Sequence, residues 1–301
     1  MFHGSALLTA LMFVGLLRTM RPHQWVKNLF VMLPLVFGQE LFHTAEALRA
    51  AYATLLFCLA SSAVYVGNDL VDVESDRAHP IKCRRPIASG AVTESAARWA
   101  MLALGSVAVG GGLLIAPEFA LCAGAYLVLN LAYSLRLKRI PYIDVGCIAL
   151  GFELRVLGGS FAVPVEPSVY LLLVTFALAL FLGFGKRRHE LGQGERAGKQ
   201  RAVLRAYRTG AVDALLWVSA AVTIAVYAAY TLEPATRGRF GTDYLVITTL
   251  FTGVGVMRFL SLVRGSHDAE SPTEQMLKDA PFIGNLAAWA LVTLLLIYFA
   301  P

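Results

Sequence analysis

Long apolar runs recur along almost the whole chain, and they constrain the fold more than any other feature. Nine runs have about the length that a helix needs to cross a membrane. They lie at residues 26–43, 46–68, 95–115, 118–136, 142–162, 168–186, 212–232, 243–263 and 281–300. The runs are continuous, whereas strands of a transmembrane barrel alternate apolar and polar residues. With 57% hydrophobic and only 15% charged residues, the chain is predicted to be an all-α, polytopic membrane protein with nine transmembrane helices.

The distribution of Lys and Arg orients these helices. If the N-terminus and every second connection lie on one side, that side carries all the Lys and Arg of the connections except Arg49, Arg237 and Arg239. Cytoplasmic connections collect such residues. We therefore predict a cell-membrane protein whose N-terminus and charged loops are cytoplasmic. The same bias explains the net charge of +6, so no nucleic-acid partner is expected.

The N-terminus and the cysteines add little chemistry. The apolar stretch at residues 5–17 is too short to cross a membrane comfortably, so residues 1–21 are expected to form an interfacial helix. The four cysteines include no CxxC pair, which indicates neither a disulfide framework nor a zinc site. No linker or soluble domain is visible, and residues 1–301 are predicted to form a single transmembrane domain.

A cluster of carboxylates stands where the second apolar run ends. If the helix continues through NDLVDVESD, then Asn68, Asp69, Asp72 and Asp76 fall within one arc of about 100°. Polar groups at membrane depth need a partner, and Mg²⁺ takes one or two carboxylates together with water and substrate phosphate. We predict that the three Asp residues are catalytic and bind Mg²⁺, and through it a diphosphate, while Asn68 contacts the substrate.

This motif resembles the NDxxDxxxD sequence of the UbiA superfamily of intramembrane transferases. RPHQWVKN, LAYSLRLKRIPYIDV, GFELRVLGG and GKRRHEL resemble, within that superfamily, the phosphoribosyltransferases that act on decaprenyl phosphate. The resemblance runs from about Arg21 to Tyr207. It implies a UbiA-type bundle with a cytoplasmic active site, Mg²⁺ as cofactor, and transfer of phosphoribose from phosphoribosyl pyrophosphate to a polyprenyl phosphate, on the way to lipid-linked arabinose for the cell envelope.

The loop after the sixth run departs from the usual superfamily pattern, which has a second Asp-rich motif there. In GKRRHELGQGERAGKQRAVLRAYRTG the only acids are Glu190 and Glu195, among many Lys and Arg. One acidic motif with many bases suits substrates that carry several phosphates, as phosphoribosyl pyrophosphate and a polyprenyl phosphate do. Two alternatives stay open: prenyl transfer from a prenyl diphosphate to an aromatic acceptor, and cation transport through an intramembrane acidic site.

Further candidates for substrate binding lie in the predicted cytoplasmic loops and helix ends. They are Lys27, Asn28, Lys82, Arg84, Arg85, Tyr133, Lys138, Asp144, Arg155, Lys186, Arg187 and Glu190. Bases of this kind bind phosphates, although the positive-inside rule alone explains several of them. Arg155 falls inside a run, with a substrate phosphate or Asp144 as its expected partner. Glu190 could pair with Lys186 at i, i+4, or bind ribose hydroxyls or a metal-bound water. A homo-oligomer is compatible with the sequence.

Overall fold

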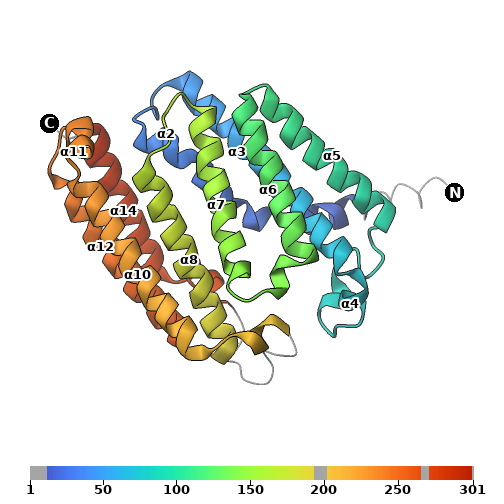
Figure 1. The fold of residues 1–301 in the computed structure, drawn as a ribbon. Coiled ribbons are helices and arrows are strands. Elements are labelled where there is room, and N and C mark those ends of the chain that lie inside the picture. Colours follow the sequence, from blue (N-terminus) through green and yellow to red (C-terminus); the bar gives the residue numbers. More distant parts are fainter. Residues whose placement is uncertain (1–11, 193–201, 266–270, 300–301) are drawn as a thin grey trace. The chain divides into compact units, whose positions relative to one another are not determined.

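The computed structural model describes residues 12–192, 202–265 and 271–299, and this part of the chain contains helices and connections but no strand (Figure 1). Eight segments are long and apolar enough to cross a membrane. They are α3 (Thr44–Val71), α5 (Glu94–Leu113), α6 (Pro117–Leu135), α7 (Ile143–Ala162), α8 (Val169–Gly192), α10 (Thr209–Leu232), η5 with α12 (Tyr244–Ile247 and Thr248–Arg264) and α14 (Ala280–Phe299). The predicted all-α, multi-pass membrane protein is confirmed.

The predicted count of nine spans is not confirmed, because the first apolar run does not form one α-helix. It folds as the 3₁₀-helix η1 (Pro22–Met32), followed by the short α-helix α2 (Leu33–Phe37). Pro34 lacks the backbone N–H that a continuous helix would use. At rises of about 2.0 Å and 1.5 Å per residue, the two together extend about 30 Å, which is close to the thickness of the hydrocarbon core.

The predicted interfacial helix at residues 1–21 is described only in part. Residues 12–20 are helical, and residues 1–11 lie outside the described part of the chain. The helix ends at Arg21, whose backbone is left-handed (φ 53°). This turn separates the N-terminal helix from η1.

Contacts between Cα atoms divide the chain into two compact units. Unit 1 comprises Met1–Leu137 and Leu154–Pro167. In it α3 lies against α5, α6 and η1 (Figure 1). Phe57 of α3 packs edge-on against Phe119 and Tyr126 of α6, with ring centroids 5.5 and 5.8 Å away. Close packing of this kind, in place of a hydrophobic effect, holds helices together in lipid.

The end of α3 continues into the loop that carries most of the predicted site. Asp72 separates α3 from the short helix α4 (Val73–Arg77), and η2 (Lys82–Arg84) follows. Thr93 then accepts a hydrogen bond from the Ala96 N–H and so caps α5. These turns bring the chain back beside the end of α3.

Unit 2 comprises Lys138–Glu153 and Ser168–Pro301. In it α8 packs along α10, and α12 along α14. Gly185 allows α8 to approach α12, because a Cβ there would lie 2.4 Å from the Phe259 ring. Shorter elements connect these helices. They are η3 (Leu137–Arg139), η4 (Ala202–Ala206), α11 (Pro234–Phe240) and α13 (Pro272–Gln275). Because α7 has residues in both units, the single domain expected from the sequence stays a prediction.

Candidate active site

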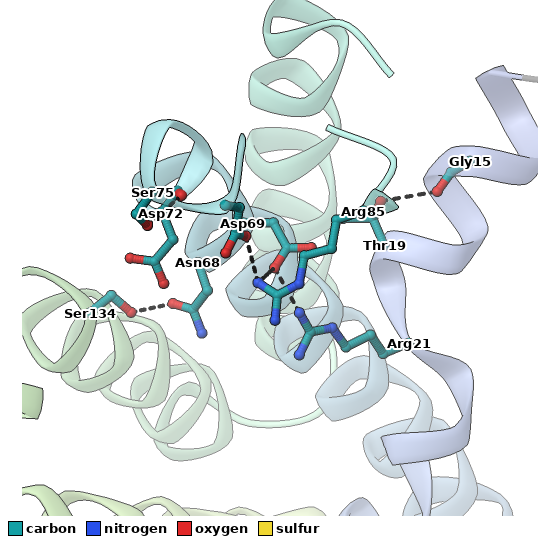
Figure 2. Close-up of polar contacts among 10 residues, drawn as sticks. Gly15, Thr19, Arg21, Asn68, Asp69, Asp72, Ser75, Arg85 and Ser134 are labelled. Atoms are coloured by element: carbon teal, nitrogen blue, oxygen red, sulfur yellow. Dashed lines mark hydrogen bonds and ion pairs between the residues drawn. The ribbon is translucent and has the colours of Figure 1, made fainter. Parts of the chain in front are cut away.

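Two buried carboxylates, one at the end of α3 and one in α4, share one arginine (Figure 2). Asp69 and Asp76 are each 3% exposed. Arg85 Nη1 donates hydrogen bonds to Asp76 Oδ2 at 2.6 Å and to Asp69 Oδ1 at 3.2 Å. Arg21 Nη2 donates to the same Asp69 oxygen at 2.6 Å. Two arginines thus neutralise two carboxylates in a nearly water-free position.

The local backbone explains why both arginines reach this point. The left-handed turn at Arg21 directs its side chain toward α3, where the guanidinium also lies 5.0 Å from the centre of the Tyr65 ring. Arg85 follows η2, and its own N–H is bonded to the Lys82 carbonyl. Buried carboxylates require such partners, because an unpaired charge is costly at this depth.

The predicted metal ligands are only partly brought together. Asp69 and Asp76 converge on a single cationic nitrogen, so their oxygens already fit around one positive centre. Asp72 is drawn on the side of Asn68, away from Arg85 (Figure 2). In the described residues no three His, Cys, Asp or Glu side chains form a metal-binding group. A magnesium site formed by Asp69, Asp72 and Asp76 stays a prediction that the carboxylate pair fits.

Asn68 links the motif to α6. The Ser134 hydroxyl shares its one proton between the Asn68 side-chain oxygen (Figure 2) and the Asn130 carbonyl, which lies 2.8 Å away. Ser134 is buried. This contact fixes the orientation of the Asn68 amide, since its oxygen is used within the protein.

Arg155 lies in a polar network inside unit 1 and is 5% exposed. Its Nε donates to Asn28 Oδ1 at 2.8 Å, and its Nη2 donates to the Tyr126 hydroxyl at 2.9 Å. Its guanidinium carbon also lies 4.6 Å from the centre of the Tyr126 ring. Asn28 in turn donates to Ser61 at 3.1 Å. Neutral oxygens and a ring therefore contact this cation within unit 1, and the sequence predicts none of them, since it suggests a substrate phosphate or Asp144.

Unit 2 contains a second buried polar cluster. Asp144, at the start of α7, is 0% exposed and accepts a hydrogen bond from the Tyr207 hydroxyl. Tyr207 accepts in turn from the Tyr142 N–H at 2.8 Å. Arg187 of α8 is 1% exposed, with its Nε 3.7 Å from Asp144 Oδ2, and its Nη1 donates to Glu190. Three predicted site residues, Asp144, Arg187 and Glu190, are thus brought together.

The same cluster raises the pKa of Tyr207. Burial raises the pKa of the Tyr207 hydroxyl well above its ordinary value, and its hydrogen bond to the Asp144 carboxylate raises that pKa further. Tyr207 is therefore a neutral hydrogen-bond donor at any physiological pH. Glu190 pairs with Arg187 at i, i+3, a partner that the i, i+4 spacing of Lys186 and Glu190 does not predict.

The remaining predicted residues differ in exposure. Lys27 and Arg84 are exposed, whereas Lys82, Tyr133, Lys138 and Lys186 are partly buried. The structure does not test their roles in substrate binding, which stay predictions.

Sequence reasoning does not place four side chains that complete these clusters among the site residues: Arg21, Tyr126, Ser134 and Tyr207. The family resemblance begins at about Arg21 and ends at about Tyr207, so its extent in the sequence points to these two residues. Tyr126 and Ser134 lie on one face of α6, eight residues apart, in an ordinary apolar run. No local pattern distinguishes them from packing residues.

Comparison with known proteins identifies the family. Residues 29–278 match the UbiA prenyltransferase family. The chain belongs to this family. Among UbiA relatives, it is 33% identical to the decaprenyl-phosphate phosphoribosyltransferase of Corynebacterium glutamicum, over 95% of this chain and 88% of that protein. It is 32% identical to the enzyme of the same name from Mycolicibacterium smegmatis, over 95% of this chain and 93% of that protein.

Solved UbiA structures share the fold. A UbiA homologue from Archaeoglobus fulgidus, with GPP and Mg²⁺ bound, superimposes with a TM-score of 0.69 at 19% identity, covering 94% of this chain and 96% of that one. The same homologue was solved with Cd²⁺, again with a TM-score of 0.69, at 17% identity, covering 94% of this chain and 99% of that one. Divalent metals thus bind that UbiA protein, and the likeness at this identity concerns the fold alone.

Proposed function

We propose that the protein transfers 5-phosphoribose from phosphoribosyl pyrophosphate to a polyprenyl phosphate such as decaprenyl phosphate, releasing pyrophosphate. Its place would be the pathway to lipid-linked arabinose for the cell envelope. One observation supports this more than any other: relatives named decaprenyl-phosphate phosphoribosyltransferase match 95% of the chain at 32–33% identity.

The carboxylates at the end of α3 have a defined role in this proposal. Asp69 and Asp76 would hold Mg²⁺, because their oxygens already converge on one cationic nitrogen. Asp72, which lies on the side of Asn68, would supply a further carboxylate (Figure 2). When bound, the metal supplies positive charge for the departing pyrophosphate. Arg85 and Arg21 then become available to the phosphate oxygens, to which arginine binds well.

The polar residues of the loops would bind the other phosphates and the ribose. Lys82, Arg84, Lys27, Lys138 and Lys186 carry the charge that a ribose phosphate and a lipid phosphate need. Glu190, which is partly buried and held by Arg187, is an acceptor suited to ribose hydroxyls. Asp144 is fully buried and would contribute to substrate binding by positioning Tyr207 and Arg187.

The reaction itself needs no strong base. The lipid phosphate is already ionised, and one of its oxygens attacks the anomeric carbon from the face opposite the pyrophosphate. The carbon–oxygen bond to pyrophosphate breaks as the new one forms. The anomeric carbon inverts, and the product is a β-linked phosphoribosyl lipid.

A product assay tests the proposal. Purified protein is incubated with Mg²⁺, phosphoribosyl pyrophosphate and polyprenyl phosphate, and the joined lipid is measured by mass spectrometry. Asp72→Ala and Asp76→Asn should abolish the product, as should a chelator. Glu74→Gln is a matched control, because Glu74 is an exposed acid of the same loop and should leave the product yield unchanged.

Membership of a prenyltransferase family supports prenyl transfer as a second candidate, with an aromatic acceptor as the alternative that the sequence leaves open. The same preparation is therefore also given prenyl diphosphates and aromatic acids. Prenylated product there, with none from phosphoribosyl pyrophosphate, would contradict the proposal and favour this alternative.

A further inference from the structure

A groove of about 550 Å³ runs along unit 1 between α3, α5 and α6. Most of its wall is aliphatic, as with Val64, Leu102 and Leu127. Polar side chains gather at one end, where Asn68, Asn130 and Ser134 line it. From Val71 to Ala63 the groove follows α3 over about 12 Å, at 1.5 Å per residue.

Two glycines of α5 keep the groove open. A Cβ atom at Gly110 would meet nothing within 4 Å, and one at Gly105 would meet only Leu127 Cδ1, at 3.5 Å. Neither glycine is therefore required for helix packing or for a special backbone angle. The space they leave is lined by hydrocarbon on a helix that faces the lipid for most of its length, since only 17% of the α5 window is buried.

The polar end of the groove is part of the acidic motif. Asn68 precedes Asp69, and its side-chain oxygen is taken by the Ser134 hydroxyl (Figure 2). A ligand at this end therefore meets the amide N–H groups of Asn68, which are donors suited to an anionic phosphate. Away from this end it meets mainly aliphatic side chains and glycine, with the Ser106 hydroxyl as the one polar side chain that α5 contributes to the lining. The groove thus combines hydrogen-bond donors beside the carboxylates with a mainly apolar wall.

We propose that this groove binds the first isoprene units of the polyprenyl phosphate acceptor, with the phosphate at the Asn68 end. This inference rests on the proposed function and adds a place for the lipid to it. A membrane lipid with an anionic head and a long apolar chain fits both ends of the groove, and the groove is continuous with the acidic motif through Asn68. A second copy of the chain would cover an apolar face but would not need the amide donors at one end.

Filling the groove is the test. In Gly110→Leu and Gly105→Leu the new side chain occupies the channel, while Gly124→Leu is the matched control. Gly124 lies on α6, its Cβ would also meet nothing within 4 Å, and it does not line the groove. KM is measured in mixed micelles for a fifty-carbon and for a ten-carbon polyprenyl phosphate. Retention of the fifty-carbon lipid is measured separately by native mass spectrometry.

We expect Gly110→Leu and Gly105→Leu to raise KM for the long lipid at least about tenfold, the effect of losing the burial of about two methylene groups. KM for the ten-carbon lipid should rise by a similar factor, because its two isoprene units are the ones that the groove would hold. The kcat and melting temperature should be unchanged, and the long lipid should no longer be retained. Gly124→Leu should match the wild type throughout.

Two results would overturn the inference. The first is an unchanged KM and unchanged lipid retention in folded variants. The second is a change of oligomeric state alone, which would assign the groove to a second copy of the chain. Failure of the proposed function would give a different result from failure of the groove assignment. If the wild type forms no product from phosphoribosyl pyrophosphate but retains the lipid in a Gly110-dependent way, the groove stands and the donor is wrong.

Discussion

Arg85 neutralises Asp69 and Asp76 together, and both acids are almost fully buried. A divalent metal bound by the same oxygens would therefore compete with a guanidinium that is already in place. Arg85 is itself about one-third exposed, so its side chain has room to leave toward solvent. If metal and Arg85 compete in this way, removing the arginine should make the stability of the protein depend more strongly on Mg²⁺.

We expect Arg85→Gln to lower stability in the absence of metal by about 3 kcal/mol, the low end of the range for losing one partner of a buried charge pair. Mg²⁺ should restore much of this loss, because it replaces the missing positive charge. Melting curves recorded with chelator and along a Mg²⁺ titration measure both effects.

Arg84→Gln serves as the control, since Arg84 is exposed in the same loop. It should leave the melting temperature and its dependence on Mg²⁺ unchanged. Equal curves for the two variants would show that Arg85 does not compete with the metal.

Tyr207 contributes through its hydroxyl, which donates to Asp144 and accepts from the Tyr142 N–H. We expect Tyr207→Phe to destabilise the protein by about 1–3 kcal/mol near neutral pH, because buried polar groups lose their partner. The variant should also bind phosphoribosyl pyrophosphate more weakly if Asp144 positions the ribose. Thermal unfolding and a binding isotherm give the two readouts.

The pH dependence of that loss follows from the raised pKa of Tyr207. The unfolded chain ionises this tyrosine near pH 10, while the folded protein keeps it neutral to a higher pH. The stabilisation is thus complete below about pH 10 and decreases above it. The gap in melting temperature between wild type and Tyr207→Phe should therefore be constant up to about pH 10 and narrow above it, and a gap that stays constant above about pH 10 would contradict the assignment.

At the scale of elements, Asp279 joins two helices of unit 2. Arg258 of α12 donates to its two carboxylate oxygens at 2.9 and 2.6 Å, and the Phe282 N–H of α14 donates to it at 2.9 Å. Asp279 thus caps the first turn of α14 and pairs with α12 at once. The hydrogen bond from Arg258 lowers the pKa of Asp279 below its ordinary value.

We expect melting temperatures to decrease from wild type to Asp279→Asn to Asp279→Ala, by a few degrees at each step. Asparagine keeps the cap but loses the ion pair, and alanine loses both. Because the folded pKa is lowered, the ion pair stabilises above about pH 4 and is lost as the pH falls through the folded pKa. The difference between wild type and Asp279→Asn should therefore vanish in strong acid but persist near neutral pH.

Elements are predictable where an apolar run ends at charges or proline. The run predicted at 118–136 is the helix Pro117–Leu135, and the one predicted at 142–162 is Ile143–Ala162. The 3₁₀ structure of the first run is not predictable in this way, because 3₁₀ and α-helices present similar apolar spacing and differ mainly in hydrogen bonding. Site partners such as Arg155 and Asn28, which are 127 residues apart, leave no local pattern at all.

At the scale of the whole molecule, the number of crossings decides on which sides the two ends lie. The eight long helices alone would place the segments before α3 and after α14 on the same side of the membrane. If η1 and α2 also cross, nine crossings put them on opposite sides. The length of this segment, about 30 Å, allows a crossing. Its exposed Lys27 lies in the middle of η1, and a long side chain there can extend toward the interface.

We expect a crossing, with the N-terminus in the cytoplasm, because most Lys and Arg of the connections then lie on the cytoplasmic side. A fluorescent protein should be bright when fused to the N-terminus, and alkaline phosphatase should be active when fused to the C-terminus. The controls are alkaline phosphatase fused to the N-terminus, which should be inactive, and the fluorescent protein fused to the C-terminus, which should be dark. If the two ends report the same side, η1 and α2 enter the membrane without crossing it. The charged loops between the long helices would then all lie on the side opposite the two ends. Both ends in the cytoplasm would therefore put these loops on the side away from soluble phosphoribosyl pyrophosphate and contradict the proposed reaction.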